Sequence, residues 1–152
     1  MANVTSQWAK TTRPTGDASP YRSSSLAFGR GSQGEIRVSL DIGVDNLGSG
    51  DKWEFVRLPA DAVIDGMFIT VDDLDTNGTP TLTFDLVSDD GSTATTHLDG
   101  TAIGKTGGSA AAGANFPRLG GDAEISVYAL VDGPAATAAA GKATLVIYLS
   151  GK

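Results

Sequence analysis

The chain has 152 residues, no cysteine and a formal net charge of −7. This length suits one domain with its own core, and the absence of cysteine excludes a disulfide framework, thiolate chemistry and zinc–thiolate sites. Neither the apolar leader of a signal peptide nor a run long enough to span a membrane is visible. We therefore expect a protein that is made in a cytoplasm and has no membrane partner.

The charge is distributed unevenly along the chain. Residues 1–30 carry four basic residues and one acidic residue, a balance of +3. Residues 31–152 carry 7 basic and 17 acidic residues, a balance of −10. An acidic body repels the phosphates of nucleic acids, whose binding depends on clustered Lys and Arg. We expect no nucleic-acid partner.

Residues 1–34 are predicted to form an extended N-terminal arm, because they are rich in Ser, Thr, Gly and Pro and show no strand or helix period. Isolated aromatic residues in such a segment are typical of anchors that bury a large area against a partner. The predicted partner contacts are Trp8, Lys10, Arg13, Tyr21, Arg22, Phe28 and Arg30. Two alternatives stay open: the aromatic residues pack on their own domain, or the charges belong to a frayed terminus.

Alternation of apolar and polar residues predicts the strands of a single domain over residues 35–152. In the second strand Trp53 and Phe55 share one face, and Gly66 inside the third indicates a bulge. The alanine-rich segment 132–142 is predicted to be a loop, because it is too short to nucleate a helix between Pro134 and Gly141. Strands are expected over residues 35–42, 53–58, 62–71, 81–87, 93–103, 124–131 and 143–149.

These strands number about seven, and no convincing helix accompanies them. No connection is long and helical enough for a parallel crossover, so antiparallel pairing is favoured. The sequence therefore predicts an all-β fold, an antiparallel β-sandwich that is jelly-roll-like, with an extended N-terminal arm. Residues 104–121 are expected to be a flexible connection rich in small residues.

The stretch VDDLDTNGTP contains a partial calcium-loop pattern. Asp73, Asp75 and Asn77, followed by Gly78, match the opening of D-x-[DN]-x-[DN]-G. The twelfth position is Phe84 instead of Glu, and the flanking segments are predicted strands rather than helices. Because Asn-Gly is a favoured turn pair, we favour a turn, with a surface calcium site of another geometry as the alternative. No cofactor is expected.

Residue patterns for catalysis are also lacking. The single histidine, His97, lies in a polar stretch and is expected to be solvated. Adjacent carboxylates such as Asp72 and Asp73 point to opposite faces of a strand and so do not form an acid–base pair. The segment GKTGG lacks the frame of a phosphate-binding loop. The sequence therefore predicts a protein that is not an enzyme.

Three segments of the chain share a pattern of strands and turns with a known group of proteins: DKWEFVRLPADAVIDGMFITV (51–71), Leu74-Asp75-Thr76 and GKATLVIYL (141–149). In these segments the chain resembles small virion proteins of tailed bacteriophages. Among such proteins the chain is most similar in size, acidity and arm to capsid decoration, or cement, proteins. The resemblance implies a module, often a homotrimer, that binds the outer surface of an assembled capsid in the virion. It implies the major capsid protein as partner, with neighbouring subunits clamped together.

Two other interpretations stay open. A receptor- or carbohydrate-binding β-sandwich of a phage tail would expose aromatic residues beside polar loops, and Tyr128 and Tyr148 are the candidates for this role. A tail-tube or head-completion protein would form closed rings. The copy number in the particle separates decoration, with hundreds of copies, from a tail location with a handful.

Overall fold

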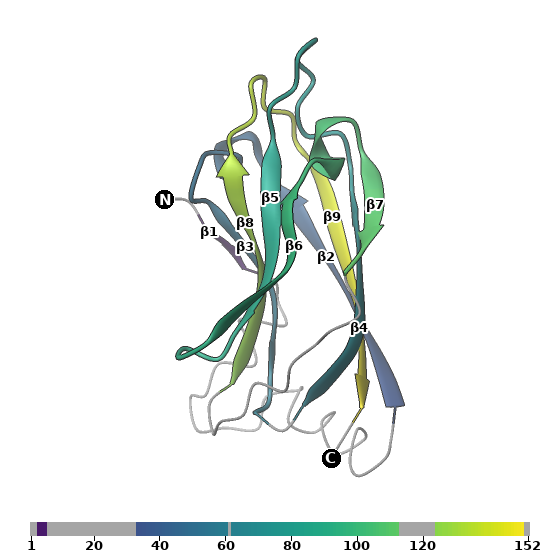
Figure 1. Ribbon diagram of the computed structural model, residues 1–152. Coiled ribbons are helices and arrows are strands. Elements are labelled where there is room, and N and C mark those ends of the chain that lie inside the picture. The colour runs from purple at the N-terminus through teal and green to yellow at the C-terminus, as the bar shows by residue number, and fades with distance from the viewer. Residues whose placement is uncertain (1–2, 6–32, 61, 113–123, 151–152) are drawn as a thin grey trace.

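The computed structural model describes residues 3–5, 33–60, 62–112 and 124–150. They form two β-sheets that face each other as two layers (Figure 1). One sheet has the strand order β1-β3-β8-β5-β6, and the other has the order β2-β9-β4-β7. The strands are β1 (Asn3–Thr5), β2 (Gln33–Ile42), β3 (Lys52–Leu58), β4 (Val63–Val71), β5 (Thr83–Asp89), β6 (Ala94–Thr101), β7 (Gly108–Ala111), β8 (Ile125–Gly133) and β9 (Gly141–Ser150), with short 3-10 helices η2 (Val44–Asn46) and η3 (Ile103–Lys105).

The predicted antiparallel sandwich is confirmed. Strands β2 to β9 make two four-stranded antiparallel sets, β2-β9-β4-β7 and β3-β8-β5-β6. Consecutive strands change sheet at every connection except the β5–β6 hairpin. This is the strand arrangement of a jelly roll. All seven predicted strands are present, and the β4 register shifts between Ile64 and Gly66, as the glycine indicated.

Two short strands were not predicted, so the described residues contain nine strands instead of about seven. β1 lies within the segment expected to be an arm, and it pairs parallel to β3, whereas only antiparallel pairing was expected. β7 pairs with β4 at the edge of its sheet, inside the segment expected to be a flexible connection. Neither strand has the alternating large apolar residues that the prediction relied on, because β1 reads NVT and β7 reads GSAA.

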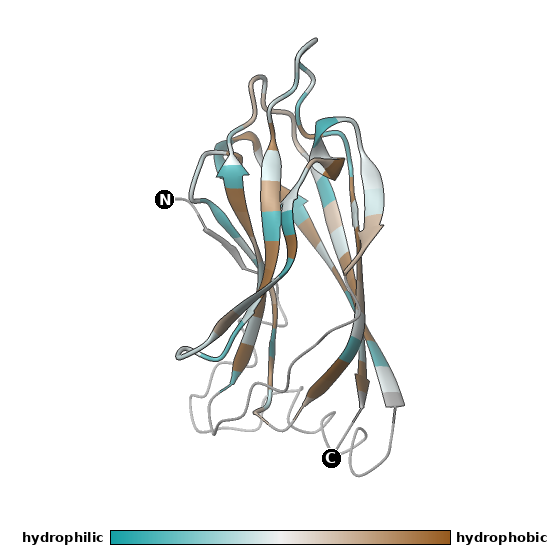
Figure 2. Cartoon of the chain, in the orientation of Figure 1, coloured by the Kyte–Doolittle hydropathy of each residue, from teal (hydrophilic) through white to brown (hydrophobic). Residues whose placement is uncertain are grey.

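The core fills the space between the two sheets. Figure 2 shows apolar residues along the strands of both layers. Trp53, Phe55 and Phe84 are among the largest fully buried side chains, and the Trp53 and Phe84 rings pack with their centroids 5.2 Å apart. The indole N–H of Trp53 donates to the Asn46 carbonyl at 2.8 Å, so burial leaves no polar atom of this ring unpaired. In the part of the chain described here, no helix is long and apolar enough to cross a membrane.

The two ends of the sandwich differ in what they carry. The connections β2–β3, β4–β5, β6–β7 and β8–β9 gather at the end that is uppermost in Figure 1. β2 and β4 begin at the opposite end, where β9 terminates, because Gln33 and Val63 both pair with Ser150. The upper end holds the acidic β4–β5 loop, and the lower end holds the exposed tyrosine described below.

Candidate interaction surface

The predicted partner contacts of the arm lie outside the described residues. These are Trp8, Lys10, Arg13, Tyr21, Arg22, Phe28 and Arg30. Of the segment 1–34, the structure describes β1 and the first two residues of β2. β1 is hydrogen-bonded to β3 of the domain itself. The contact role of the arm therefore stays a prediction.

The β4–β5 loop is organised around Asp75, whose side chain is only 1% exposed. Its Oδ2 accepts backbone N–H groups from Thr81 (2.7 Å), Leu82 (3.1 Å) and Ala136 (3.0 Å). Its Oδ1 accepts the N–H of Thr137 at 2.8 Å. The carboxylate thus joins its own loop to the β8–β9 loop, about sixty residues further along the chain.

The electrostatics of Asp75 follow from these contacts. Burial disfavours the charged carboxylate and on its own would raise the pKa of Asp75. The backbone N–H groups that point at both oxygens outweigh burial and hold the pKa well below its ordinary value. Asp75 is therefore an ionised anchor of the loop structure.

Asp73 and Asn77 act as turn residues in the same loop. Asp73 Oδ1 accepts the N–H of Asp75 at 3.2 Å, and Asn77 Oδ1 accepts the N–H of Thr79 at 2.9 Å. The Asn77 amide also donates to the Thr137 hydroxyl at 2.9 Å. These contacts agree with the turn that the sequence favoured. Among the described residues, no three His, Cys, Asp or Glu side chains are grouped so that they could hold a metal ion.

His97 differs from the expectation of a solvated side chain. It is half-buried, and its Nε2 lies 2.7 Å from the Ser88 hydroxyl. Burial lowers the pKa of His97. Ser88, which makes this contact with His97, is itself buried on β5. The sequence did not indicate this pair, because the β5–β6 register that brings the two residues together contains irregularities.

On the outer face of the β1-β3-β8-β5-β6 sheet, Tyr128 is covered by contacts with Lys52 and Asp89. Tyr128 is 7% exposed, because the Lys52 Nζ lies 3.8 Å from its ring centroid. Its hydroxyl is 3.5 Å from Asp89 Oδ2. Burial, and then the negative charge of Asp89, raise the pKa of the Tyr128 hydroxyl. Tyr128 is therefore not the exposed aromatic residue that a sugar-binding surface requires.

The outer face of the β2-β9-β4-β7 sheet has a different character. Tyr148 on β9 is 47% exposed and Phe68 on β4 is 40% exposed. Val146, which is buried, lies two residues before Tyr148 on the same face of β9 and is directly opposite Phe68 on β4. Arg37 flanks Val146 on the other side. We call this set, Tyr148, Val146 and Phe68, the aromatic strip.

A hydroxyl row continues the same face toward the upper end of the sandwich. Ser39 and Thr144 share a hydrogen bond of 2.8 Å between β2 and β9, and Thr70 and Ser109 share one of 2.9 Å between β4 and β7. The register places all four residues in one cross-strand row. The face thus combines the aromatic strip with small polar side chains, a mixture that suits a protein contact better than a reaction centre.

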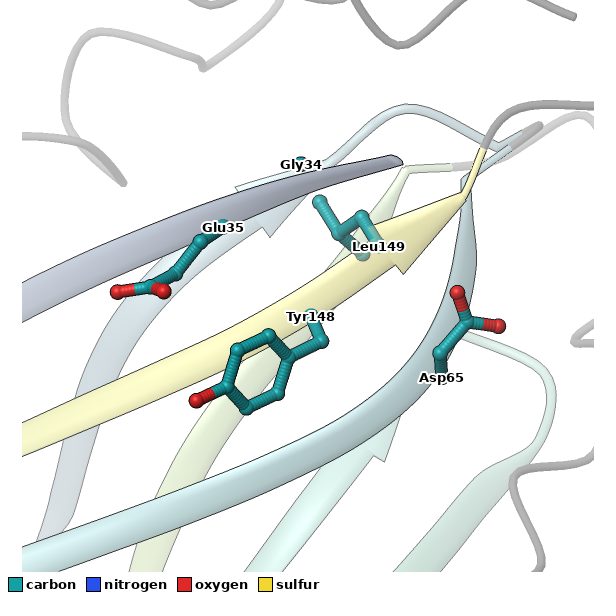
Figure 3. A pocket seen from close by; sticks show the side chains of 5 residues that line it. All are labelled: Gly34, Glu35, Asp65, Tyr148 and Leu149. Atoms are coloured by element: carbon teal, nitrogen blue, oxygen red, sulfur yellow. The ribbon is translucent and has the colours of Figure 1, made fainter. Parts of the chain in front are cut away.

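At the lower end of this face, Tyr148 borders an open hollow of about 410 Å³. The hollow is lined by Gly34, Glu35, Asp65, Tyr148 and Leu149. Figure 3 shows Tyr148 on β9 between Glu35 on β2 and Asp65 on β4, with the Asp65 carboxylate pointing away from the tyrosine ring.

Sequence reasoning found Tyr148 but missed its neighbours. Phe68 occupies an outward position that period-two alternation along β4 indicates, and this signal was available. Glu35 and Asp65 belong to other strands, so only the register of β9 with β2 and β4 brings them to the tyrosine. A single sequence does not provide that register.

Known structures share this fold. No protein-family model matches the chain, and no curated protein matches it in sequence. A chain of the cyanophage Pam1 capsid asymmetric unit is similar with a TM-score of 0.67 and 22% identity, over 80% of this chain and 86% of that chain. A chain of the capsid of Ralstonia phage GP4 is similar with a TM-score of 0.66 and 24% identity, over 99% of both chains. At such identities the likeness establishes a common fold.

Proposed function

We propose that this chain is a non-enzymatic structural protein of a phage virion, which binds the outer surface of an assembled capsid and clamps neighbouring major capsid subunits. The observation that carries the proposal is the fold likeness to a chain from the capsid of Ralstonia phage GP4, over 99% of both chains. The chain from the Pam1 capsid supports it over 80% of this chain. Folds host many functions, so the surface must also suit the role.

The interior of the domain supports a role in adhesion. The described groups with unusual environments have structural partners: Asp75 holds two loops together, Tyr128 lies under Lys52, and His97 contacts Ser88. Each of these groups is engaged inside the fold. None lines the open hollow. The exposed chemistry instead lies on the outer face of the β2-β9-β4-β7 sheet.

The contact mechanism that we propose combines this face with the arm. The aromatic and basic residues of the arm bind apolar and acidic positions on the shell. Fixing the backbone of a bound segment costs about 1–2 kcal/mol per residue, so a single arm needs a large contact area. A homotrimer presents three arms, and binding of one raises the effective concentration of the others. Trimerisation is thus part of the proposal.

A reconstitution experiment tests this function. Purified chain is added to expanded capsid shells that lack it, and bound protein is measured after sedimentation. We expect saturable binding at a copy number set by the shell lattice, together with shells that withstand higher temperature. Binding without any gain in shell stability would contradict clamping, and no binding to shells would contradict the proposal.

The arm is tested separately. Replacing Trp8, Tyr21 and Phe28 together by Ser is expected to reduce shell binding strongly while the thermal unfolding of the isolated chain stays the same. A matched control replaces exposed residues of the domain that lie away from the aromatic strip, such as Thr76 and Ser92. If the arm variant binds as tightly as the unchanged chain, the arm is not the anchor.

One observation favours a second candidate, a receptor- or carbohydrate-binding module of a phage tail. Tyr148 is exposed beside two carboxylates, which is an arrangement that sugar sites also use. This candidate predicts a handful of copies at the tail, whereas decoration predicts hundreds on the head. Quantitative mass spectrometry of purified particles distinguishes them.

A further inference from the structure

We propose that Asn77 is a site of self-modification by deamidation, at which the backbone nitrogen of Gly78 displaces the side-chain amide nitrogen of Asn77 as ammonia. Both residues are exposed in the β4–β5 loop, at the upper end of the sandwich (Figure 1). The inference goes beyond the proposed function and does not depend on it, because the reaction needs only the folded chain and water.

The sequence supplies the reacting pair. A backbone nitrogen reaches a preceding asparagine side chain most readily when it belongs to glycine, because no Cβ crowds the attacking atom. Asn77-Gly78 is the one Asn-Gly pair among the 152 residues. A Cβ at Gly78 would meet nothing within 4 Å, and both residues are exposed. Hydroxide and water therefore have access to the pair.

The turn holds the asparagine amide in an orientation that favours attack. Asn77 Oδ1 accepts the N–H of Thr79 at 2.9 Å. This hydrogen bond closes a ring that contains both Asn77 Cγ and the Gly78 nitrogen, so the electrophilic carbon stays folded back over the peptide that attacks it. The same N–H points at the oxygen on which negative charge develops, and a backbone N–H in that place stabilises the transition state.

The leaving nitrogen has a partner on the neighbouring loop. Asn77 Nδ2 donates to Thr137 Oγ1 at 2.9 Å. When this nitrogen becomes tetrahedral it also becomes basic, and the Thr137 hydroxyl can turn and donate its own proton to it. The backbone of Thr137 is fixed for this role, because its N–H donates to Asp75 Oδ1 at 2.8 Å and its carbonyl accepts the N–H of Thr76 at 3.0 Å.

The reaction consumes only water, with hydroxide as the base. Hydroxide removes the amide proton of Gly78, the nitrogen bonds to Asn77 Cγ, and the carbonyl electron pair moves to Oδ1. The pair then returns, the Cγ–Nδ2 bond breaks, and ammonia leaves with the proton of the Thr137 hydroxyl, which water restores. Water opens the cyclic imide at either carbonyl and yields aspartate or isoaspartate. One neutral amide becomes one carboxylate, so the formal net charge changes from −7 to −7 − 1 = −8.

An Asp-Gly pair of the same chain provides an internal comparison. A carboxyl group can form the same cyclic imide, but only when it is protonated, because an ionised carboxylate is a poor electrophile. The N–H groups of Thr93 and Ser92 donate to Asp90 Oδ1 and lower the pKa of Asp90. The Gly91 N–H, which would be the nucleophile, donates to Asp89 Oδ1 at 2.7 Å. This pair should therefore stay intact under conditions in which the asparagine reacts.

Peptide mapping of the aged chain tests the site. The purified full chain is kept at 37 °C and about pH 8.5, folded in one sample and unfolded in guanidinium chloride in another, and its peptides are quantified by mass spectrometry. We expect isoaspartate and aspartate at residue 77 of the folded chain, formed at least as fast as in the unfolded chain, with Asn46 and Asp90 unchanged. Isoaspartate is the diagnostic product, because direct hydrolysis of the side-chain amide yields aspartate alone.

Variants identify the groups responsible. Gly78→Ala should slow the reaction roughly tenfold to a hundredfold, because the added Cβ displaces the nitrogen from its line of attack. Thr137→Val should slow it roughly twofold to tenfold, as the loss of one neutral hydrogen bond would, and Thr137→Ser should retain the rate. The matched control is Thr81→Val. It removes a hydroxyl that joins the same two loops, through a bond of 2.6 Å to the Pro134 carbonyl, without touching the reacting amide, and should leave the rate unchanged.

Three results would overturn the inference. A reaction at Asn77 that is much slower in the folded chain than in the unfolded chain would show that the turn protects the amide. Aspartate without isoaspartate would show direct hydrolysis instead of attack by Gly78. A faster reaction in Thr137→Val would show that the hydroxyl restrains the amide and does not assist the loss of ammonia.

Discussion

The substitution Asp75→Asn tests whether one buried carboxylate organises the upper end of the sandwich. Four backbone N–H groups lie between 2.7 and 3.1 Å from its two oxygens. An asparagine amide offers one acceptor oxygen and turns an NH₂ group toward N–H donors. No orientation of the amide therefore preserves the contacts at both oxygens.

The magnitude follows from these four contacts. At about 1 kcal/mol for each hydrogen bond, full loss corresponds to about 4 kcal/mol. Three of the four N–H donors belong to exposed residues, so water can replace part of the hydrogen bonding that the substitution removes. We expect a loss of about 2–4 kcal/mol in the free energy of unfolding, which lowers the Tm by roughly 5–15 °C in a chain of this size.

Calorimetry and urea titration measure this change, and amide hydrogen exchange locates it. Exchange should accelerate at Leu82 and at Thr137, which lie on the two loops that Asp75 joins. The control Asp73→Asn, in the same loop, loses one exposed contact of 3.2 Å and should cost less than about 1 kcal/mol. If Asp75→Asn is as stable as the unchanged chain, or costs no more than Asp73→Asn, the anchoring role is refuted.

Three further predictions concern pH, packing and metal. Because folding lowers the pKa of Asp75, its ionised carboxylate stabilises the fold fully above the ordinary carboxyl pKa of 3.8, and this stabilisation is lost progressively as the pH falls below that value. The free energy of unfolding, measured from pH 6 to pH 2, should therefore depend less on pH in Asp75→Asn. Gly133→Ala should lower the free energy of unfolding by about 1–3 kcal/mol, because the added Cβ would lie 2.6 Å from Thr83 Oγ1. The control Gly78→Ala should be nearly neutral, because its Cβ would meet nothing within 4 Å. Equal melting temperatures of the two variants would contradict the close packing at Gly133. Millimolar calcium should leave the melting temperature unchanged, because the Asp75 oxygens already accept backbone N–H groups; a clear rise would reveal a site.

The strands could be predicted because alternation is a local signal. Ile36, Val38 and Leu40 are buried while their neighbours are exposed, which is the pattern that the sequence predicts for β2. β1, which reads NVT, and β7, which reads GSAA, lack that signal, and each pairs at the edge of its sheet. Their existence depends on the strands that they join.

The surface was less predictable, because it depends on contacts between distant segments. The alternation along their strands places both Tyr128 and Tyr148 on outward faces. Lys52 from a neighbouring strand covers Tyr128, whereas Tyr148 is exposed. Asp75 matched a metal-loop pattern, and its actual partners include N–H groups about sixty residues away. In both cases strand register and loop packing decided the outcome.

A cryo-EM reconstruction of the particle that contains this chain tests the central claim most directly. The account predicts a β-sandwich on the outside of the head, repeated at symmetry-related positions in hundreds of copies, with density bridging adjacent major capsid subunits. Density confined to the tail, or a location inside the shell, would contradict it.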